Sequence, residues 1–510
     1  MIKNNIGKEI PKQFADQYGV FDKQFSNIKP FEEASRHINP VKPDDEKLLG
    51  SIREAIEKTG LKDGMTISFH HHFREGDYVI NMVLDEIAKM GIKNISIAPS
   101  SLANVHEPVI EHIKSGMITN ITSSGLRDKI GAVISEGIME NPVVIRSHGG
   151  RARAIVSGDI KIDVAFLGAP SSDAYGNING TKGKANCGSL GYAMIDAKYA
   201  DQVVAITDSL MPYPNVPISI PQTDVDFVVE VNEIGDPEGI ASGATRFTQD
   251  PKELLIAEYA AEVITRSPYF KKDWSFQTGT GGAALAVSRY LRREMIEKDI
   301  TASFVLGGIT NAMVELHKEG LVDKIIDVQD FDKNSAISLG ENENHYEIDA
   351  EFYASPFSKG SAINQLDVCI LSALEIDTNY NVNVLTGSDG VIRGASGGHS
   401  DTSAASKLSL VISPLIRGRI ATVVDEVNTV VTPGASIDVV VTEVGISINP
   451  ERKDLIEAFK DLDVPQFTME ELRDKAYEVV GKPKTIEYGD KTVALVEYRD
   501  GTLIDAVNNV

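Results

Sequence analysis

The sequence predicts an α/β fold made of two related halves, each a mainly parallel sheet covered by helices. The first observation is an alternation of element types along the chain. Short β-branched runs such as 95–98 and 143–145 alternate with segments of helical periodicity such as 79–89. Continuous apolar strands that alternate with helices are typical of parallel sheets buried on both faces.

The second observation is an internal repeat. The run DVAFLGAPSSDAYGNIN (163–179) matches DVCILSALEIDTNYNVN (367–383) at seven of seventeen positions without a gap. Further on, PQTDVDFVVEV from Pro221 parallels PGASIDVVVTEV from Pro433, and the segment 95–118 resembles 303–322. Three matched blocks in the same order indicate a duplicated domain.

The repeat also suggests where the chain divides. A chain of 510 residues exceeds what one core usually serves. The turn-rich stretch NEIGDPEGIASG (232–243) is the expected junction. We therefore expect an N-terminal half over 1–235, with an extension to about residue 60, and a C-terminal half over 245–510.

Composition excludes several classes of protein. A net charge of −24 disfavours a nucleic-acid-binding surface, which must be basic. No run approaches the roughly 18 apolar residues that a membrane span needs, and the first twenty residues lack the apolar core of a secretory signal. Two isolated cysteines fit a reducing compartment. We expect a cytoplasmic protein without nucleic-acid or membrane partners.

Glycine-rich turns follow two of the predicted strands. In QTGTGGAALA (277–286) the glycines open a helix, where backbone N–H groups could face a phosphate, a carboxylate or an oxyanion. Gly307 and Gly308 end a strand and imply close approach of the backbone. A merely tight turn, or helix–strand packing, stays open as the alternative at both places.

Basic residues cluster in two places. His70, His71 and His72 precede Arg74, and no further ligands at a recognisable spacing support a metal site there. That leaves polyanion binding or a surface role. The segment 146–153 carries three arginines and His148 after a strand, and guanidinium groups suit carboxylates or phosphates. A solvated basic turn is the alternative.

A long loop of small residues, GSDGVIRGASGGHSDTSAAS (387–406), is the third feature. Loops of this length are usually functional or disordered. Because an apolar run resumes at Leu408, we expect a functional loop.

Together these segments resemble the citrate lyase α chain family. The resemblance rests on SFHHHFREGD (68–77), APSSDAYGNING (169–180), QTGTGG (277–282) and VVTEVGISINP (440–450), and it extends over essentially the whole chain. More broadly, the chain is similar to the CoA-transferase superfamily of NagB/RpiA-like fold, in which the site lies between two α/β half-domains. The repeat agrees with that architecture.

The resemblance implies an enzyme that moves an acyl-carrier thioester from acetyl to citrate. The glutamate nucleophile of related transferases aligns near Gly307, which implies a non-covalent mixed-anhydride route. No tightly bound cofactor is implied, because the CoA-like group of the acyl carrier, or a CoA thioester, is the substrate. The implied partners are citrate, the acyl-carrier subunit and a citryl lyase β subunit, in a homo- and hetero-oligomer.

The resemblance also suggests roles for single residues. The catalytic candidates are backbone donors and one carboxylate: Gly279, Gly281, Gly282, Gly307, Gly308 and Glu375. The candidates for citrate carboxylates are His70, His72, Arg74, Arg146, His148 and Arg151. The candidates for a pantetheine channel are Gly397, Gly398 and Asp401.

Three alternatives stay open. A citramalate lyase α chain or a general acyl-CoA transferase would differ from this prediction in few pocket residues. A CoA-dependent hydrolase would let water reach the same intermediates. A sugar-phosphate-binding regulator on the same fold would need a DNA-binding segment, and neither end of the chain has a basic helix-turn-helix pattern.

Overall fold

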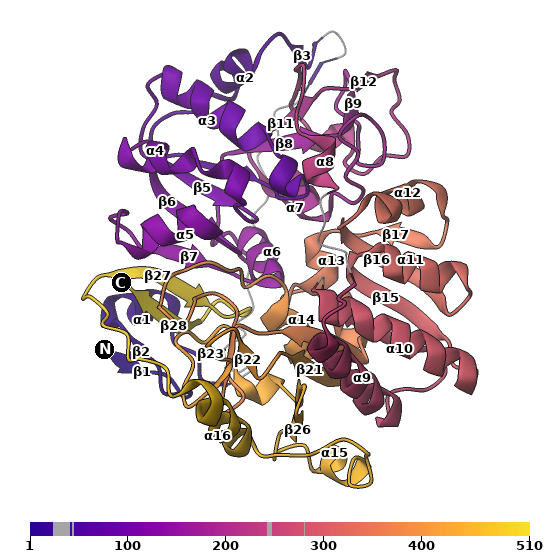
Figure 1. Cartoon of the computed structure of the whole chain (residues 1–510). Helices are drawn as coiled ribbons and strands as arrows, with labels where there is room; N and C mark the ends of the chain where they lie inside the picture. Colours follow the sequence, from indigo (N-terminus) through magenta and orange to yellow (C-terminus); the bar gives the residue numbers. More distant parts are fainter. Residues whose placement is uncertain (24–40, 43–44, 242–246, 280) are drawn as a thin grey trace.

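The computed structural model describes residues 1–23, 41–42, 45–241, 247–279 and 281–510 (Figure 1). Two sheets, each flanked by helices, lie one above the other in Figure 1, and both chain termini lie at the left beside the first sheet. None of the helices in these residues combines the length and the apolar character that a bilayer crossing requires.

The first sheet has ten strands in the order β28-β27-β7-β6-β5-β4-β8-β11-β13-β3. Pairing is parallel throughout except between the last two strands of the chain. The bounds are β3 (Leu48–Leu49), β4 (Thr66–Phe69), β5 (Ile95–Pro99), β6 (Ile118–Ser123), β7 (Val143–Ile145), β8 (Val164–Ala169), β11 (Gln202–Thr207), β13 (Phe227–Glu230), β27 (Thr492–Glu497) and β28 (Leu503–Asn508).

The second sheet has eight strands in the order β17-β16-β15-β14-β18-β21-β25-β26. Only β26 is antiparallel to its neighbour. The bounds are β14 (Trp274–Thr278), β15 (Ala302–Ile309), β16 (Val322–Asp330), β17 (His345–Glu347), β18 (Val368–Ser372), β21 (Leu408–Ile412), β25 (Val439–Thr442) and β26 (Gly445–Ile448).

The same strand order recurs in both sheets, as the sequence repeat predicts. β7-β6-β5-β4-β8-β11-β13 of the first sheet corresponds to β17-β16-β15-β14-β18-β21-β25 of the second. The repeated aspartates also make the same kind of hydrogen bond in each half. Asp163 accepts a hydrogen bond from the backbone N–H of Thr66, and Asp367 accepts one from that of Ser275. The α/β prediction with mainly parallel sheets is confirmed.

Helices cover the sheets and also fill the space between them. The helix expected over 79–89 is α3, which turns five apolar side chains into the first core. Helices α6 and α7 of the first half pack against α13 of the second, and all three lie between the sheets in Figure 1. The bounds are α1 (Lys12–Tyr18), α3 (Val79–Lys89), α5 (Asp128–Ser135), α6 (His148–Val156), α7 (Gly191–Tyr199), α10 (Gly282–Lys298), α13 (Ala350–Ala354) and α14 (His399–Ala405), with further helices α2 (Ile52–Thr59), α4 (Val109–Lys114), α8 (Pro237–Ile240), α9 (Pro251–Arg266), α11 (Asn311–Lys318), α12 (Lys333–Glu341), α15 (Lys453–Ala458) and α16 (Met469–Val480).

The end of the chain returns to the first sheet. β27 pairs in parallel with β7, so that Leu495 lies opposite Val144, and β28 becomes the edge strand. Membership of the second sheet therefore follows the expected C-terminal half only as far as Ile448. Pairing with β27 satisfies the backbone groups that β7 would otherwise expose at a sheet edge. Residue 245, where the second half was expected to begin, lies outside the described residues.

Candidate active site

A cavity of about 650 Å³ opens at the carboxyl ends of the second sheet's strands. The ends of β14, β15, β16 and β18 form its floor, and the loop 384–399 forms one wall. The first half contributes Arg127, His148 and Tyr192 to the opposite side. In open parallel sheets the crevice beyond the carboxyl ends of the strands is where ligands bind. The cavity is therefore the candidate active site.

The start of α10 opens into this cavity. Gly279 and Gly281 line it, and among the described residues no side chain caps the helix. A Cβ added at Gly281 would meet no atom within 4 Å. The N–H of Gly279 is occupied, because it donates to the carbonyl of Ile370 at 3.0 Å. For the N–H groups of Gly281 and Gly282 no partner is found among the described residues, which leaves them as the donors of this turn.

Gly307 and Gly308 differ in what they contact. Gly308 lines the cavity, and a Cβ there would come within 2.1 Å of the Phe331 ring. Gly307 is buried outside the cavity lining, has a φ of +102°, and would meet the Gln277 side chain at 2.7 Å. The packing explanation therefore accounts for both glycines, and only Gly308 also faces the cavity.

The small-residue loop supplies a wall of the cavity. Gly397 and Gly398 line it, and the N–H of His148 donates to the carbonyl of Gly397 at 2.8 Å. Asp401 does not line it. Its carboxylate accepts from the Ser147 hydroxyl at 2.9 Å and from the Gly149 N–H at 2.8 Å, and so caps α6 from the other half.

Three arginines line the cavity, and none of them is among the site residues predicted from the sequence. Arg127 is exposed, and within the described residues it has no ion-pair partner. Arg393 pairs with Asp389 at the rim, and Arg417 donates to the Ala373 carbonyl at 3.1 Å. Desolvation lowers the pKa of Arg417. Each of these arginines follows a leucine or an isoleucine without a distinctive motif, so only the unusual loop around Arg393 carried any signal.

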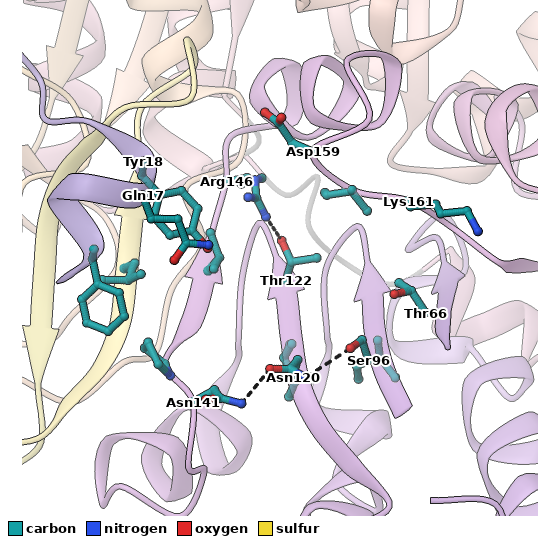
Figure 2. Close-up of a pocket in the computed structure, with 17 residues that line it drawn as sticks. Gln17, Tyr18, Thr66, Ser96, Asn120, Thr122, Asn141, Arg146, Asp159 and Lys161 are labelled. Carbon is teal, nitrogen blue, oxygen red and sulfur yellow. Dashed lines mark hydrogen bonds between the residues drawn. The ribbon is translucent and has the colours of Figure 1, made fainter. Parts of the chain in front are cut away.

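The arginines singled out from the sequence lie elsewhere. Arg146 binds the Glu497 carboxylate through two nitrogens, both at 2.9 Å. It lines a separate cleft with Tyr18 and Thr122, on the side of the first sheet that α1 covers (Figure 2). Arg151 makes a fork on Asp196 with both distances at 2.8 Å, and it is buried. Both guanidinium groups are thus engaged with buried carboxylates of the fold.

The histidines after β4 are packed inside the first half. The rings of His70 and His72 stack with centroids 3.7 Å apart. Gly168 lies between them in the hydrogen-bond pattern: its N–H donates to His70 Nε2 at 2.9 Å, and its carbonyl contacts His72 Nε2 at 3.1 Å. Burial lowers the pKa of both rings, that of His72 to about 3. Neutral rings outside the cavity do not balance a carboxylate charge.

Arg74 reaches the cavity wall indirectly. Its guanidinium donates to the carbonyl of Phe331 at 2.6 Å and lies 5.0 Å from the centroid of that ring. Phe331 itself lines the cavity. Arg74 therefore supports the wall from the first half.

His148 is the one predicted basic residue that lines the cavity directly. Its Nδ1 lies 2.6 Å from the hydroxyl of Tyr192. Burial, with the charge of Arg151, lowers the pKa of His148 to about 3. The ring is therefore neutral near pH 7.

Glu375 lies in β19 (Glu375–Asp377), beside the cavity but outside its lining. Its carboxylate accepts from the side-chain amide of Asn383 at 2.9 Å and from that of Asn428 at 3.1 Å. Burial raises its pKa. These contacts hold two loops together.

One group of side chains could hold a cation. In the described part of the chain, the ligand atoms of Asp327, Asp330 and His345 lie within 4.8 Å of one another, and all three are buried. Burial raises the pKa of Asp327 to about 8, so a proton held there also relieves the repulsion between the carboxyl groups. Asp330 accepts from the N–H of Ser189, which joins the two halves behind the cavity.

Comparison with known proteins places the chain in one family. The family model for the citrate lyase alpha subunit (CitF) matches residues 45–510. The citrate lyase alpha chain of Haemophilus influenzae is 56% identical over 466 residues, which cover 91% of this chain and 93% of that protein. The corresponding chain of Escherichia coli is 54% identical and covers 91% of each protein.

Solved structures agree. A crystal structure described as the alpha subunit of citrate lyase from Streptococcus mutans, in complex with citrate, is 75% identical, has a TM-score of 0.98 and covers 100% of each chain. The malonate decarboxylase alpha subunit of Acinetobacter baumannii shares the fold alone, at 14% identity and a TM-score of 0.62 over 86% of this chain and 94% of that one. The chain belongs to the citrate lyase alpha subunit family and is therefore an acyl-transferase subunit of a larger enzyme.

Proposed function

We propose that the chain exchanges the acyl group on a carrier thioester, converting acetyl carrier and citrate into citryl carrier and acetate. The observation that carries this proposal is that one cavity combines the start of α10, which no side chain of the described residues caps, with three arginines. Thioester exchange between carboxylates needs donors for an oxyanion and cations for the acid, and both line this cavity.

The first half of the reaction forms an anhydride. A citrate carboxylate oxygen attacks the acetyl carbonyl, and the carbonyl oxygen becomes an oxyanion. The N–H groups at the start of α10 stabilise that oxyanion, since they are oriented before the charge develops. Collapse of the intermediate breaks the C–S bond and releases the carrier thiolate, leaving acetyl citryl anhydride.

The second step of the reaction cleaves the anhydride. The thiolate attacks the citryl carbonyl of the anhydride, and acetate leaves with the oxygen that citrate supplied. The enzyme must hold both partners in register, where proximity supplies several kcal/mol, and must exclude water from the anhydride. No carboxylate of the chain takes part in this route.

The cavity also supports citrate as the acid. Citrate has three carboxylates near neutral pH, and the cavity is bordered by Arg127, Arg393 and Arg417 in a chain of net charge −24. Since the Arg393 guanidinium is already paired with Asp389, those of Arg127 and Arg417 are left for the acid. While one carboxylate reacts, citrate offers two more to them and citramalate only one. The related Streptococcus mutans protein was crystallised with citrate, which favours the same assignment.

Carrier and partner subunits complete the proposal. Gly397 and Gly398 leave one wall of the cavity without side chains, and that wall suits an extended pantetheine arm. The chain then needs no tightly bound cofactor. It works with an acyl-carrier subunit and a lyase subunit that cleaves the citryl thioester, in a cytoplasmic hetero-oligomer.

A single-turnover experiment tests this route. The chain, in excess over acetyl carrier or acetyl-CoA, is mixed with citrate labelled with ¹⁸O in its carboxylates. We expect citryl thioester, and acetate that contains one ¹⁸O from the first turnover. Acetate without label in the first turnover, together with a glutamyl thioester trapped by borohydride, would mean that a carboxylate of the enzyme is the nucleophile. Citramalate and acetate serve as competing acceptors.

A further inference from the structure

The contact between His148 and Tyr192 fixes which imidazole nitrogen faces the cavity. His148 is the first residue of α6 and Tyr192 the second residue of α7, and both side chains line the cavity. The Tyr192 hydroxyl lies 2.6 Å from His148 Nδ1, and the two rings have centroids 4.6 Å apart. This contact joins two helices of the first half above a cavity whose floor belongs to the second.

The direction of this hydrogen bond follows from the state of both groups together with the partners available to the hydroxyl. Burial raises the pKa of Tyr192 well above its usual value, so its hydroxyl keeps its proton and can donate it. His148 is neutral, and a neutral imidazole has one donor and one acceptor nitrogen. If Nδ1 donated instead, the Tyr192 hydroxyl hydrogen would have no acceptor among the described residues, so we take Nδ1 as the acceptor, and Nε2 then carries the hydrogen. In the described part of the chain, Nε2 has no partner of its own.

We propose that Tyr192 is a positioning residue, which holds His148 in the Nε2–H tautomer so that this N–H donates to a substrate oxygen in the cavity. The inference deepens the proposed function, since it names the first half's donor for that reaction. The opposite tautomer would turn a lone pair toward a carboxylate or an oxyanion and repel it. A neutral donor also cannot give up its proton to a carboxylate as readily as an imidazolium would.

The surroundings of the pair favour this arrangement. The His148 N–H of the backbone is bound to Gly397, which fixes the start of α6 against the second half. His71 stacks on Tyr192 with centroids 4.9 Å apart and supports the phenol from behind. Tyr192 is 4% exposed, so its hydroxyl has little competition from water.

The tautomer can be measured directly. In protein labelled with ¹⁵N-histidine, two-dimensional ¹⁵N–¹H correlation spectra separate the two neutral tautomers, and the signal of His148 is the one lost in His148→Gln. We expect the Nε2–H form in the wild type and in the control Tyr346→Phe, which changes an exposed tyrosine. In Tyr192→Phe we expect a mixture of tautomers.

Activity gives the second readout. Tyr192→Phe should lower kcat about ten- to a hundredfold with little change in the KM for citrate, because a lost orienting partner weakens the transition state most. An Nδ1–H tautomer or an imidazolium in the wild type overturns the inference, and so does an unchanged tautomer in Tyr192→Phe. If the wild type forms no citryl thioester, the proposed function fails, whereas the spectra still decide the role of Tyr192.

Discussion

The two halves use the same strand ends in opposite ways. In the first sheet Ile67 pairs with Val164, and in the second Phe276 pairs with Val368, which is the repeat partner of Val164. Counting forward from these pairs, the positions of His70, His72 and Phe73 correspond to Gly279, Gly281 and Gly282. Three large rings in one half stand where the other half has three glycines.

This difference explains why the candidate active site lies at the strand ends of the second half. In the first half the Phe73 ring packs so close to Gly168 that a Cβ there would lie 2.3 Å from it, and the stacked histidines bind the same glycine. The crevice is filled with side chains. In the second half the space stays open, and the first half supplies side chains from the turn before α5 and from α6 and α7, which lie between the sheets. Of the two duplicated halves, the second therefore holds the cavity and the first forms part of its wall.

Filling the open crevice should have the largest effect on activity. Gly281→Val adds a side chain where no atom lies within 4 Å, at a φ of −65° that valine accepts. We expect kcat to fall about a hundredfold or more, the cost of disturbing an oxyanion donor. Turnover of acetyl carrier with citrate measures this, and an unchanged melting temperature shows that the fold persists. The exposed Ile296→Val on the same helix is the control. Full activity in Gly281→Val would remove this helix start from the mechanism.

Adding a methyl group to the filled crevice of the first half should instead lower the stability of the fold. In Gly168→Ala the new methyl group collides with Phe73, and overpacking of this kind costs about 1–3 kcal/mol. Gly279→Ala is the matched change in the open half, where the nearest atom is 3.6 Å away. In urea denaturation, the midpoint should be lower than that of the wild type for Gly168→Ala and unchanged for Gly279→Ala. Equal midpoints would contradict the contrast between the halves.

The arginines divide in the same manner. Arg127→Ala should raise the KM for citrate about tenfold with little change in the melting temperature, since it removes a charged contact to substrate. Arg151→Ala should destabilise the fold, because it leaves the buried Asp196 without its partner. Arg293→Ala, at an exposed pair on α10, is the neutral control. A KM for citrate that depends on Arg151 and not on Arg127 would reverse the assignment.

The interface between the halves should show a smaller, pH-dependent effect. The pKa of Asp327 is raised to about 8 in the folded protein, above its usual value of 3.8. Folding therefore binds a proton between these values, and this contribution to stability is present at low pH and lost as the pH rises toward 8. Asp327→Asn cannot ionise. Its melting temperature relative to wild type should rise between pH 5 and pH 9, as calorimetry can measure. A constant difference would mean that Asp327 does not titrate in this range.

Local patterns in the sequence were enough for the fold and part of the site. Strand–helix alternation and the repeat predicted two parallel sheets, and glycines after strands pointed to Gly281 and Gly308, which line the cavity. Gly397 and Gly398, which the family resemblance suggested, line it as well. His148, predicted to bind citrate carboxylates, also lines the cavity. These features work because periodicity and backbone permissiveness are properties of neighbouring residues.

The carboxylate partner of each arginine could not be predicted from neighbouring residues. Arg146 and Arg151 look alike in the sequence, yet their carboxylates are Glu497 and Asp196, which are distant along the chain. Asp401 became a helix cap across the interface. A buried arginine takes whichever carboxylate the fold brings beside it, because an unpaired buried charge costs several kcal/mol.

The sequence by itself therefore determined the duplicated α/β architecture, the family and the glycine-lined helix start. Only the tertiary structure decided which half keeps an open crevice and which charges remain for a substrate. The reason is physical: secondary structure follows from local spacing, whereas a cavity and its free cations are what remains after distant side chains have packed and paired.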